Sequence, residues 1–67
     1  MKILINGIEK EFNNESMTAQ ELIKYLNIEG KRFAIECNGE IIPRGLFKEA
    51  IIKGGDQLEI VGAVGGG

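Results

Sequence analysis

The sequence has 67 residues, a mass of 7.3 kDa and a net charge of −2 at pH 7, which is enough chain for one small domain. With eight basic and ten acidic residues it offers no basic patch to neutralise phosphates, so we expect no nucleic-acid binding. Its longest apolar runs have three residues, which argues against a membrane span, and its N-terminus does not resemble a signal peptide.

The residue inventory leaves little material for catalysis or metal binding. The chain has no histidine, a single cysteine (Cys37) and a single aspartate, which excludes Ser/His and Cys/His nucleophile pairs and a Cys/His zinc site. A lone cysteine cannot form an internal disulfide, which suits a reducing cytosol. We therefore expect a cytoplasmic protein that is not an enzyme on its own and holds no metal and no cofactor.

The first predicted element is a β-hairpin. Residues 2–6 and 8–12 predict two strands joined through Asn6-Gly7, because Asn-Gly supplies the two positive-φ residues of a type I′ turn. In the second strand, Ile8, Lys10 and Phe12 share one face and the glutamates take the other. This alternation is typical of a half-buried antiparallel strand, with Lys10 as the one mismatch.

A helix is predicted next, over residues 19–26. Thr18 as N-cap and Glu21 three residues later make a capping box, and Met17 with Leu22 make a hydrophobic staple across the first turn. Apolar residues then recur at helical spacing. The asparagine that follows can adopt the left-handed conformation that ends a helix.

A third strand and a short fourth strand follow the helix. Residues 33–37 place Cys37 on their apolar face, so we expect this cysteine to pack in the core rather than relay sulfur. Asn38-Gly39 predicts a second tight turn, and residues 40–42 predict a short returning strand. That strand ends at Pro43, because proline donates no ladder hydrogen bond.

The remaining segments complete the expected fold. We expect Leu46 and Phe47 to contribute to the core from an irregular or single-turn helical stretch, and residues 57–61 to form the last strand. The order strand, strand, helix, strand, short strand, strand predicts an α+β fold, with one main helix packed on a mixed sheet of four to five strands. We place this single domain at residues 1–61.

Residues 62–67, Gly-Ala-Val-Gly-Gly-Gly, are expected to form a flexible C-terminal tail, because terminal glycines bury no side chain and have high conformational entropy. A glycine carboxylate has no β-carbon to block attack, but in its ionised form it is a poor electrophile. Conversion to an acyl-adenylate supplies a good leaving group. The chain has no nucleotide pocket for that step, so a partner enzyme must provide it.

Several segments together resemble the ThiS family, the ubiquitin-like β-grasp sulfur carriers of thiamine biosynthesis. The resemblance spans essentially the whole chain and is carried by Asn6-Gly7, the capped helix from Thr18, Asn38-Gly39-Glu40-Ile41-Ile42-Pro43-Arg44, Gly55-Asp56, Glu59-Ile60-Val61 and Val64-Gly65-Gly66-Gly67.

The resemblance implies a mechanism at the C-terminus. An E1-like enzyme (ThiF) would use ATP-Mg to adenylate Gly67, and sulfur originating from a cysteine desulfurase would displace AMP to leave a thiocarboxylate. The carrier would then deliver this sulfur to thiazole synthase (ThiG). Gly65 and Gly66 would provide a slender approach through the partner's channel.

Docking residues are expected beside the tail. Val61 and Val64 are candidates for partner contacts, since the domain offers them little burial, and Arg44 is a candidate for contact with an acidic partner surface. Three other functions stay open at this point: a MoaD-like sulfur carrier for molybdopterin synthesis, a ubiquitin-like protein modifier, and a β-grasp binding module that carries no sulfur.

Overall fold

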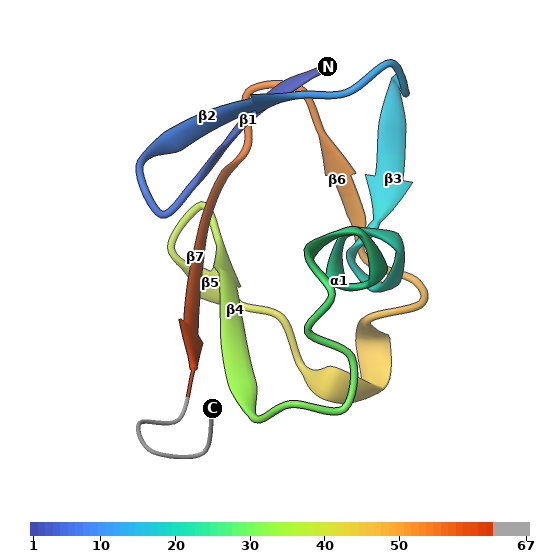
Figure 1. Ribbon diagram of the computed structural model, residues 1–67, viewed down its shortest axis with the longest axis vertical. Coiled ribbons are helices and arrows are strands. Elements are labelled where there is room, and N and C mark those ends of the chain that lie inside the picture. The colour runs from blue at the N-terminus through green and yellow to red at the C-terminus, as the bar shows by residue number, and fades with distance from the viewer. Residues whose placement is uncertain (63–67) are drawn as a thin grey trace.

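The computed structural model describes residues 1–62 (Figure 1). Its elements in chain order are β1 (Lys2–Ile5), β2 (Ile8–Glu11), β3 (Ser16–Thr18), α1 (Ala19–Leu26), β4 (Phe33–Cys37), β5 (Glu40–Ile41), the 3-10 turn η1 (Arg44–Leu46), β6 (Ile51–Lys53) and β7 (Gln57–Gly62). Every predicted strand and the predicted helix are present. Strands β3 and β6 were not predicted.

Five of these strands form a mixed sheet in the order β2-β1-β7-β4-β5. The pair β1–β7 is parallel, whereas β1–β2, β4–β7 and β4–β5 are antiparallel. Strands β3 and β6 form a separate antiparallel pair, which lies with α1 on the side of the molecule away from β7 (Figure 1). The predicted α+β fold, one helix against a mixed sheet, is confirmed.

Both Asn-Gly pairs form the predicted tight turns. Asn6 and Gly7 have φ values of 51° and 81°, and Asn38 and Gly39 have φ values of 53° and 88°. Positive φ at two consecutive residues is the requirement of a type I′ turn, which matches the twist of the strands it joins. The two turns therefore determine the β1–β2 and β4–β5 hairpins locally.

The helix has the predicted bounds and the predicted cap. The backbone N–H of Glu21 donates to Thr18 Oγ1 at 3.1 Å, and the N–H of Thr18 donates to Glu21 Oε1 at 2.8 Å. Asn27 ends the helix in the left-handed conformation, with φ of 59°. Within residues 1–62, no helix is long and apolar enough to cross a membrane.

The core lies between the five-stranded sheet and the opposing α1 and β3–β6 pair. Its buried residues come from both layers: Ile3, Ile5, Met17, Ala19, Leu22, Ile23, Ile35, Phe47, Ile52 and Leu58. Cys37 is half-buried and packs against this cluster, as predicted. Strands β3 and β6 contribute the buried side chains of Met17 and Ile52, so the strand pair that was not predicted forms one side of the core.

Two expectations about burial are wrong. Leu46 was predicted to pack in the core but is 46% exposed, because the short η1 turn directs only the next residue, Phe47, inward. The second predicted strand was expected to bury the face of Ile8, Lys10 and Phe12; Phe12 packs against the core as expected, but Ile8 is 64% exposed. This residue lies at the turn end of an edge strand, where its only strand partner is Ile5.

Four strand ends differ from the prediction by one residue. Strands β1, β2 and β5 each end one residue earlier than predicted, at Ile5, Glu11 and Ile41, and β7 continues to Gly62, which pairs with Phe33 of β4. Gly62 was assigned to the tail from the sequence, but it pairs within the sheet as part of β7. The folded domain therefore includes Gly62.

Candidate functional site

The end of β7 is the point from which the chain continues towards its terminal glycines. Strand β4 pairs with β7 along this end as far as Phe33 opposite Gly62. On the other side, β1 pairs with β7 only as far as Ile5 opposite Leu58. Four predicted site residues lie beyond the described part of the chain: Val64, Gly65, Gly66 and Gly67.

The five-stranded sheet has an outer face, defined by the side chains that point away from the core. Strand registers place on it Lys2, Leu4, Glu9, Glu11, Ala34, Glu36, Ile41, Gln57, Glu59 and Val61. Val61 is 64% exposed and Ile41 is 67% exposed. Large apolar side chains left in water on one face are typical of an interaction surface.

The outer face is also acidic. Glu36 of β4 and Glu59 of β7 are direct register partners, and like charges opposite one another across a strand pair destabilise a sheet. Glu9 and Glu11 add two more carboxylates from β2 to this face, where Lys2 is the one basic side chain among the residues named. The combination of carboxylates and exposed aliphatic groups suits a partner surface with basic and apolar groups.

Arg44 lies beside the end of β7. Its Nη2 donates a hydrogen bond to the backbone oxygen of Phe33 at 3.0 Å, and its guanidinium lies 4.9 Å from the centre of the Phe33 ring. Phe33 in turn stacks on Phe47, with ring centres 5.9 Å apart. The guanidinium is thus held in one orientation while the residue itself remains exposed, which is the condition for recognising a carboxylate or phosphate.

The structure does not place Arg44 and Val61 on one surface. Val61 pairs with Ala34 on the outer face, whereas the neighbouring pair of Phe33 and Gly62 has the opposite orientation, and Arg44 stacks on the Phe33 ring. The two predicted docking residues therefore flank the end of β7 from opposite faces of the sheet.

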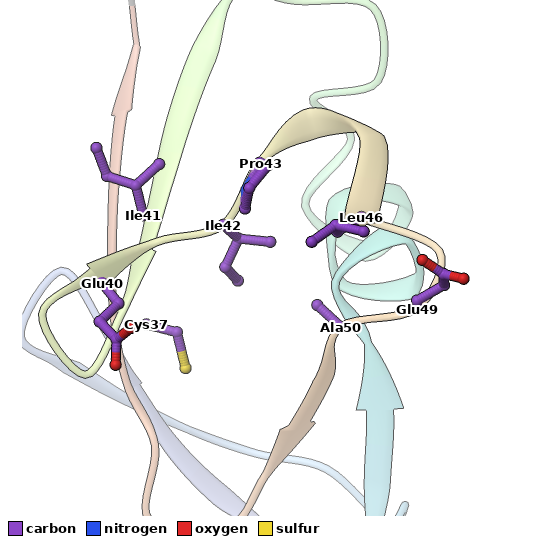
Figure 2. Close-up of a pocket in the computed structure, with 8 residues that line it drawn as sticks. All are labelled: Cys37, Glu40, Ile41, Ile42, Pro43, Leu46, Glu49 and Ala50. Atoms are coloured by element: carbon purple, nitrogen blue, oxygen red, sulfur yellow. The ribbon is translucent and has the colours of Figure 1, made fainter.

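An open hollow of about 350 Å³ lies between β5 and the segment that follows η1. Figure 2 shows Cys37, Ile42, Leu46 and Ala50 around it, with the carboxylate of Glu49 turned away. Burial raises the pKa of the Cys37 thiol, and the nearby Asp56 carboxylate raises it further. A thiol that stays protonated at neutral pH is a poor nucleophile, so the hollow does not have the character of a reactive sulfur site.

Asp56 is the buried charged residue beside this thiol, with 6% of its surface exposed. It accepts hydrogen bonds from the backbone N–H of Lys53 and from Asn38 Nδ2, each at 3.0 Å. Burial opposes its ionisation, but the hydrogen bonds from Lys53 and Asn38, the Cys37 thiol and the positive charge of Lys53 together lower the pKa of the carboxyl. Asp56 is thus a structural clamp between two turns. In the described part of the chain, no cluster of His, Cys, Asp or Glu could hold a metal ion.

Sequence reasoning missed the role of the two turn asparagines. Asn38 Oδ1 accepts from the N–H of Gln57 at 2.9 Å, at the start of β7. Asn6 bonds both peptide groups of Ile60, nearer the strand's end. The Asn-Gly signal indicated only the turns, since the side-chain partners lie 19 and 54 residues away in sequence.

The fold and this site define a ubiquitin-like β-grasp protein whose last strand leads into a glycine-rich C-terminus. Residues 3–67 match the ThiS family. The chain therefore belongs to the ThiS family.

Individual relatives agree with this assignment. The sulfur carrier protein ThiS of Bacillus subtilis is 33% identical over 63 residues, covering 94% of this chain and 96% of that one. The crystal structure of the thiamine biosynthesis protein ThiS from Geobacter metallireducens superposes with a TM-score of 0.87 and 30% identity, with both chains fully covered.

A longer relative is also similar. A thiazole synthase of Paramagnetospirillum magneticum is 40% identical over 67 residues, which is all of this chain but 20% of that protein. A second thiazole synthase, from Magnetococcus marinus, has the same coverage. This chain therefore spans about a fifth of the length of the thiazole synthases that it matches.

Proposed function

We propose that this chain is a sulfur carrier of thiamine biosynthesis, which holds sulfur as a thiocarboxylate on Gly67. The observation that carries the proposal is that the ThiS match extends through the terminal glycines, on a domain with the ThiS fold. The chain would act as a protein co-substrate in the cytoplasm, and its partners would perform the catalysis.

The reaction begins with a carboxylate that must be activated. An E1-like partner would use ATP-Mg to adenylate Gly67, with the carboxylate oxygen attacking the α-phosphorus and pyrophosphate leaving. The terminal sulfur of a persulfide donor, derived from a cysteine desulfurase, would then attack the carbonyl carbon and expel AMP. A thiol would cleave the resulting acyl disulfide, which leaves the thiocarboxylate and a new disulfide. Gly65 and Gly66, which lack side chains, would let this end pass through a narrow channel to the reacting groups.

The acceptor we propose is a thiazole synthase. In two relatives that carry this name, a sequence similar to the whole of this chain occupies about a fifth of the protein. This arrangement supports a physical association between this chain and a thiazole synthase. Docking would use the acidic outer face around Val61, with Arg44 and Val64 contributing beside the end of β7.

The test is an intact-mass measurement on the 67-residue chain. After incubation with an E1-like activating enzyme, ATP-Mg and a sulfur donor, we expect exchange of one oxygen for one sulfur, localised to Gly67 by fragmentation. Reactions without ATP, and a variant that lacks Gly66 and Gly67, are the controls and should show no exchange. An unchanged mass with an activating enzyme verified on its own carrier would overturn the proposal.

A binding measurement tests the acceptor separately. We expect the chain to associate with thiazole synthase and not with the large subunit of molybdopterin synthase. Association with the latter alone would assign the sulfur to the other pathway while leaving the thiocarboxylate chemistry intact.

A further inference from the structure

The last strand is supported unequally on its two sides near its end. Strand β4 follows β7 to Gly62, but the backbone of β1 stops after the N–H of Asn6 donates to the oxygen of Leu58 at 2.9 Å. From there the chain turns away through Gly7. A parallel neighbour would normally have supplied the next donor and acceptor to β7 at Ile60.

The side chain of Asn6 supplies both of these hydrogen bonds. Its Oδ1 accepts from the backbone N–H of Ile60 at 2.7 Å, and its Nδ2 donates to the backbone oxygen of Ile60 at 3.0 Å. The amide of a side chain has the same donor and acceptor as a peptide group. The side chain of Asn6 thus replaces the next pair of backbone hydrogen bonds on the β1 side of β7, although the backbone of Asn6 already belongs to the turn.

We propose that Asn6 is a positioning residue for the sulfur-transfer reaction, because it holds Ile60 on the side of β7 that β1 leaves unpaired, two residues before Gly62, and so restrains the strand that leads to the C-terminal segment. The inference rests on the proposed function. In the proposed reaction, the terminal carboxylate must meet the α-phosphorus of ATP in the partner's site. A fixed position of β7 would raise the rate of this step, because small misplacements of reacting groups lower rates by large factors.

The chain offers a matched control in its second Asn-Gly turn. Asn38 has almost the same backbone conformation as Asn6, and its side chain also bonds β7, but at Gln57, the strand's first residue. Replacement of either asparagine by glycine keeps a residue that tolerates positive φ and removes only the side-chain bonds. The two variants release opposite ends of β7, and Asn38→Gly also removes the hydrogen bond from Asn38 to the buried Asp56, so it is the less stable of the two.

The experiment compares three proteins as substrates of the activating enzyme: the unaltered chain, Asn6→Gly and Asn38→Gly. We expect Asn6→Gly to lower kcat for adenylation by about tenfold, with KM changed by less than about twofold because the docking face is intact. We expect Asn38→Gly to leave kcat nearly unchanged at temperatures where it is fully folded. Equal losses of kcat in the two variants, or a loss in KM alone, would overturn the positioning role.

A structural readout keeps this inference separate from the proposed function. Amide hydrogen exchange should accelerate at Ile60 in Asn6→Gly and at Gln57 in Asn38→Gly, with Leu58 protected in both. If the unaltered chain is not adenylated, the proposed function fails while the exchange data still decide whether Asn6 holds the end of β7. Unchanged exchange at Ile60 in Asn6→Gly would refute the inference even with an active carrier.

Discussion

Removal of the Asp56 carboxylate should destabilise the domain more than any other single change of a charged residue described above. Asp56 lies in the turn that leads into β7, and its two carboxylate oxygens accept from the backbone of Lys53 and from the side chain of Asn38. The carboxylate therefore joins the β6–β7 connection to the β4–β5 turn. Asp56→Ala leaves both donors without this acceptor in a site that is 6% exposed to water.

The magnitude follows from these two contacts. A hydrogen bond to a charged group contributes about 1.5–3 kcal/mol, so loss of both should lower the free energy of unfolding by about 3–6 kcal/mol. A chain of this length has a total stability of about 3–10 kcal/mol. Asp56→Ala should therefore remove a large part of the free energy of unfolding and lower the urea concentration at the denaturation midpoint.

The loss should depend on pH in a defined direction. The pKa of Asp56 is lower in the folded protein than its ordinary value of 3.8, so the ionised carboxylate stabilises the fold above that value. This stability disappears as the pH falls through the folded-state pKa. The difference in unfolding free energy between the unaltered chain and Asp56→Ala should therefore be constant near neutrality and shrink below about pH 4.

Urea denaturation followed by circular dichroism, at several pH values, measures both quantities. Asp56→Asn should show an intermediate loss, since the amide oxygen still accepts one hydrogen bond whereas its NH₂ faces donors. Glu15→Ala, at an exposed residue, is the surface control and should stay within about 0.5 kcal/mol of the unaltered chain. A loss below about 1 kcal/mol for Asp56→Ala at neutral pH would refute the clamp.

Three further outcomes are expected. Val61→Asp should weaken binding to the activating enzyme and thiazole synthase by about tenfold or more in calorimetry, with an unchanged melting temperature, because the side chain is 64% exposed. Glu59→Gln should raise stability by a few tenths of a kcal/mol in urea denaturation, by relieving its repulsion with the opposing Glu36, and should weaken partner binding more at low salt than at high salt. Cys37→Ser should retain sulfur transfer in the intact-mass assay, since the thiol packs against the core; loss of transfer in a folded Cys37→Ser protein would show that the thiol takes part in the chemistry.

The local elements of this protein were predictable because their signals lie within a few residues of one another. The capping box of Thr18 and Glu21 determines where α1 begins, and the Asn-Gly pairs determine two hairpin turns through backbone φ alone. The ThiS resemblance, including the glycine-rich C-terminus, was likewise visible in the sequence and agrees with the family match over residues 3–67.

The remaining features depend on contacts between residues far apart in the chain. Strand β3 has three residues and exists because it pairs with β6. The paired residues are 33 positions apart at Thr18 and Ile51 and 37 positions apart at Ser16 and Lys53. Neither segment is long enough to show a strand pattern alone. The exposure of Leu46 was decided by Phe47, which takes the buried place against Phe33.

The candidate site divides in the same way. The sequence by itself suggested the proposed chemistry, since the glycine-rich segment 65–67 and the lack of histidine can be read from it directly. Tertiary structure alone decided which side chains surround the end of β7. Folding brings Asn6 to Ile60 and Arg44 to Phe33, and it opposes Glu36 to Glu59 on the outer face. These arrangements arise from strand order and register, which set side-chain neighbours across the sheet and which no local pattern of residues encodes.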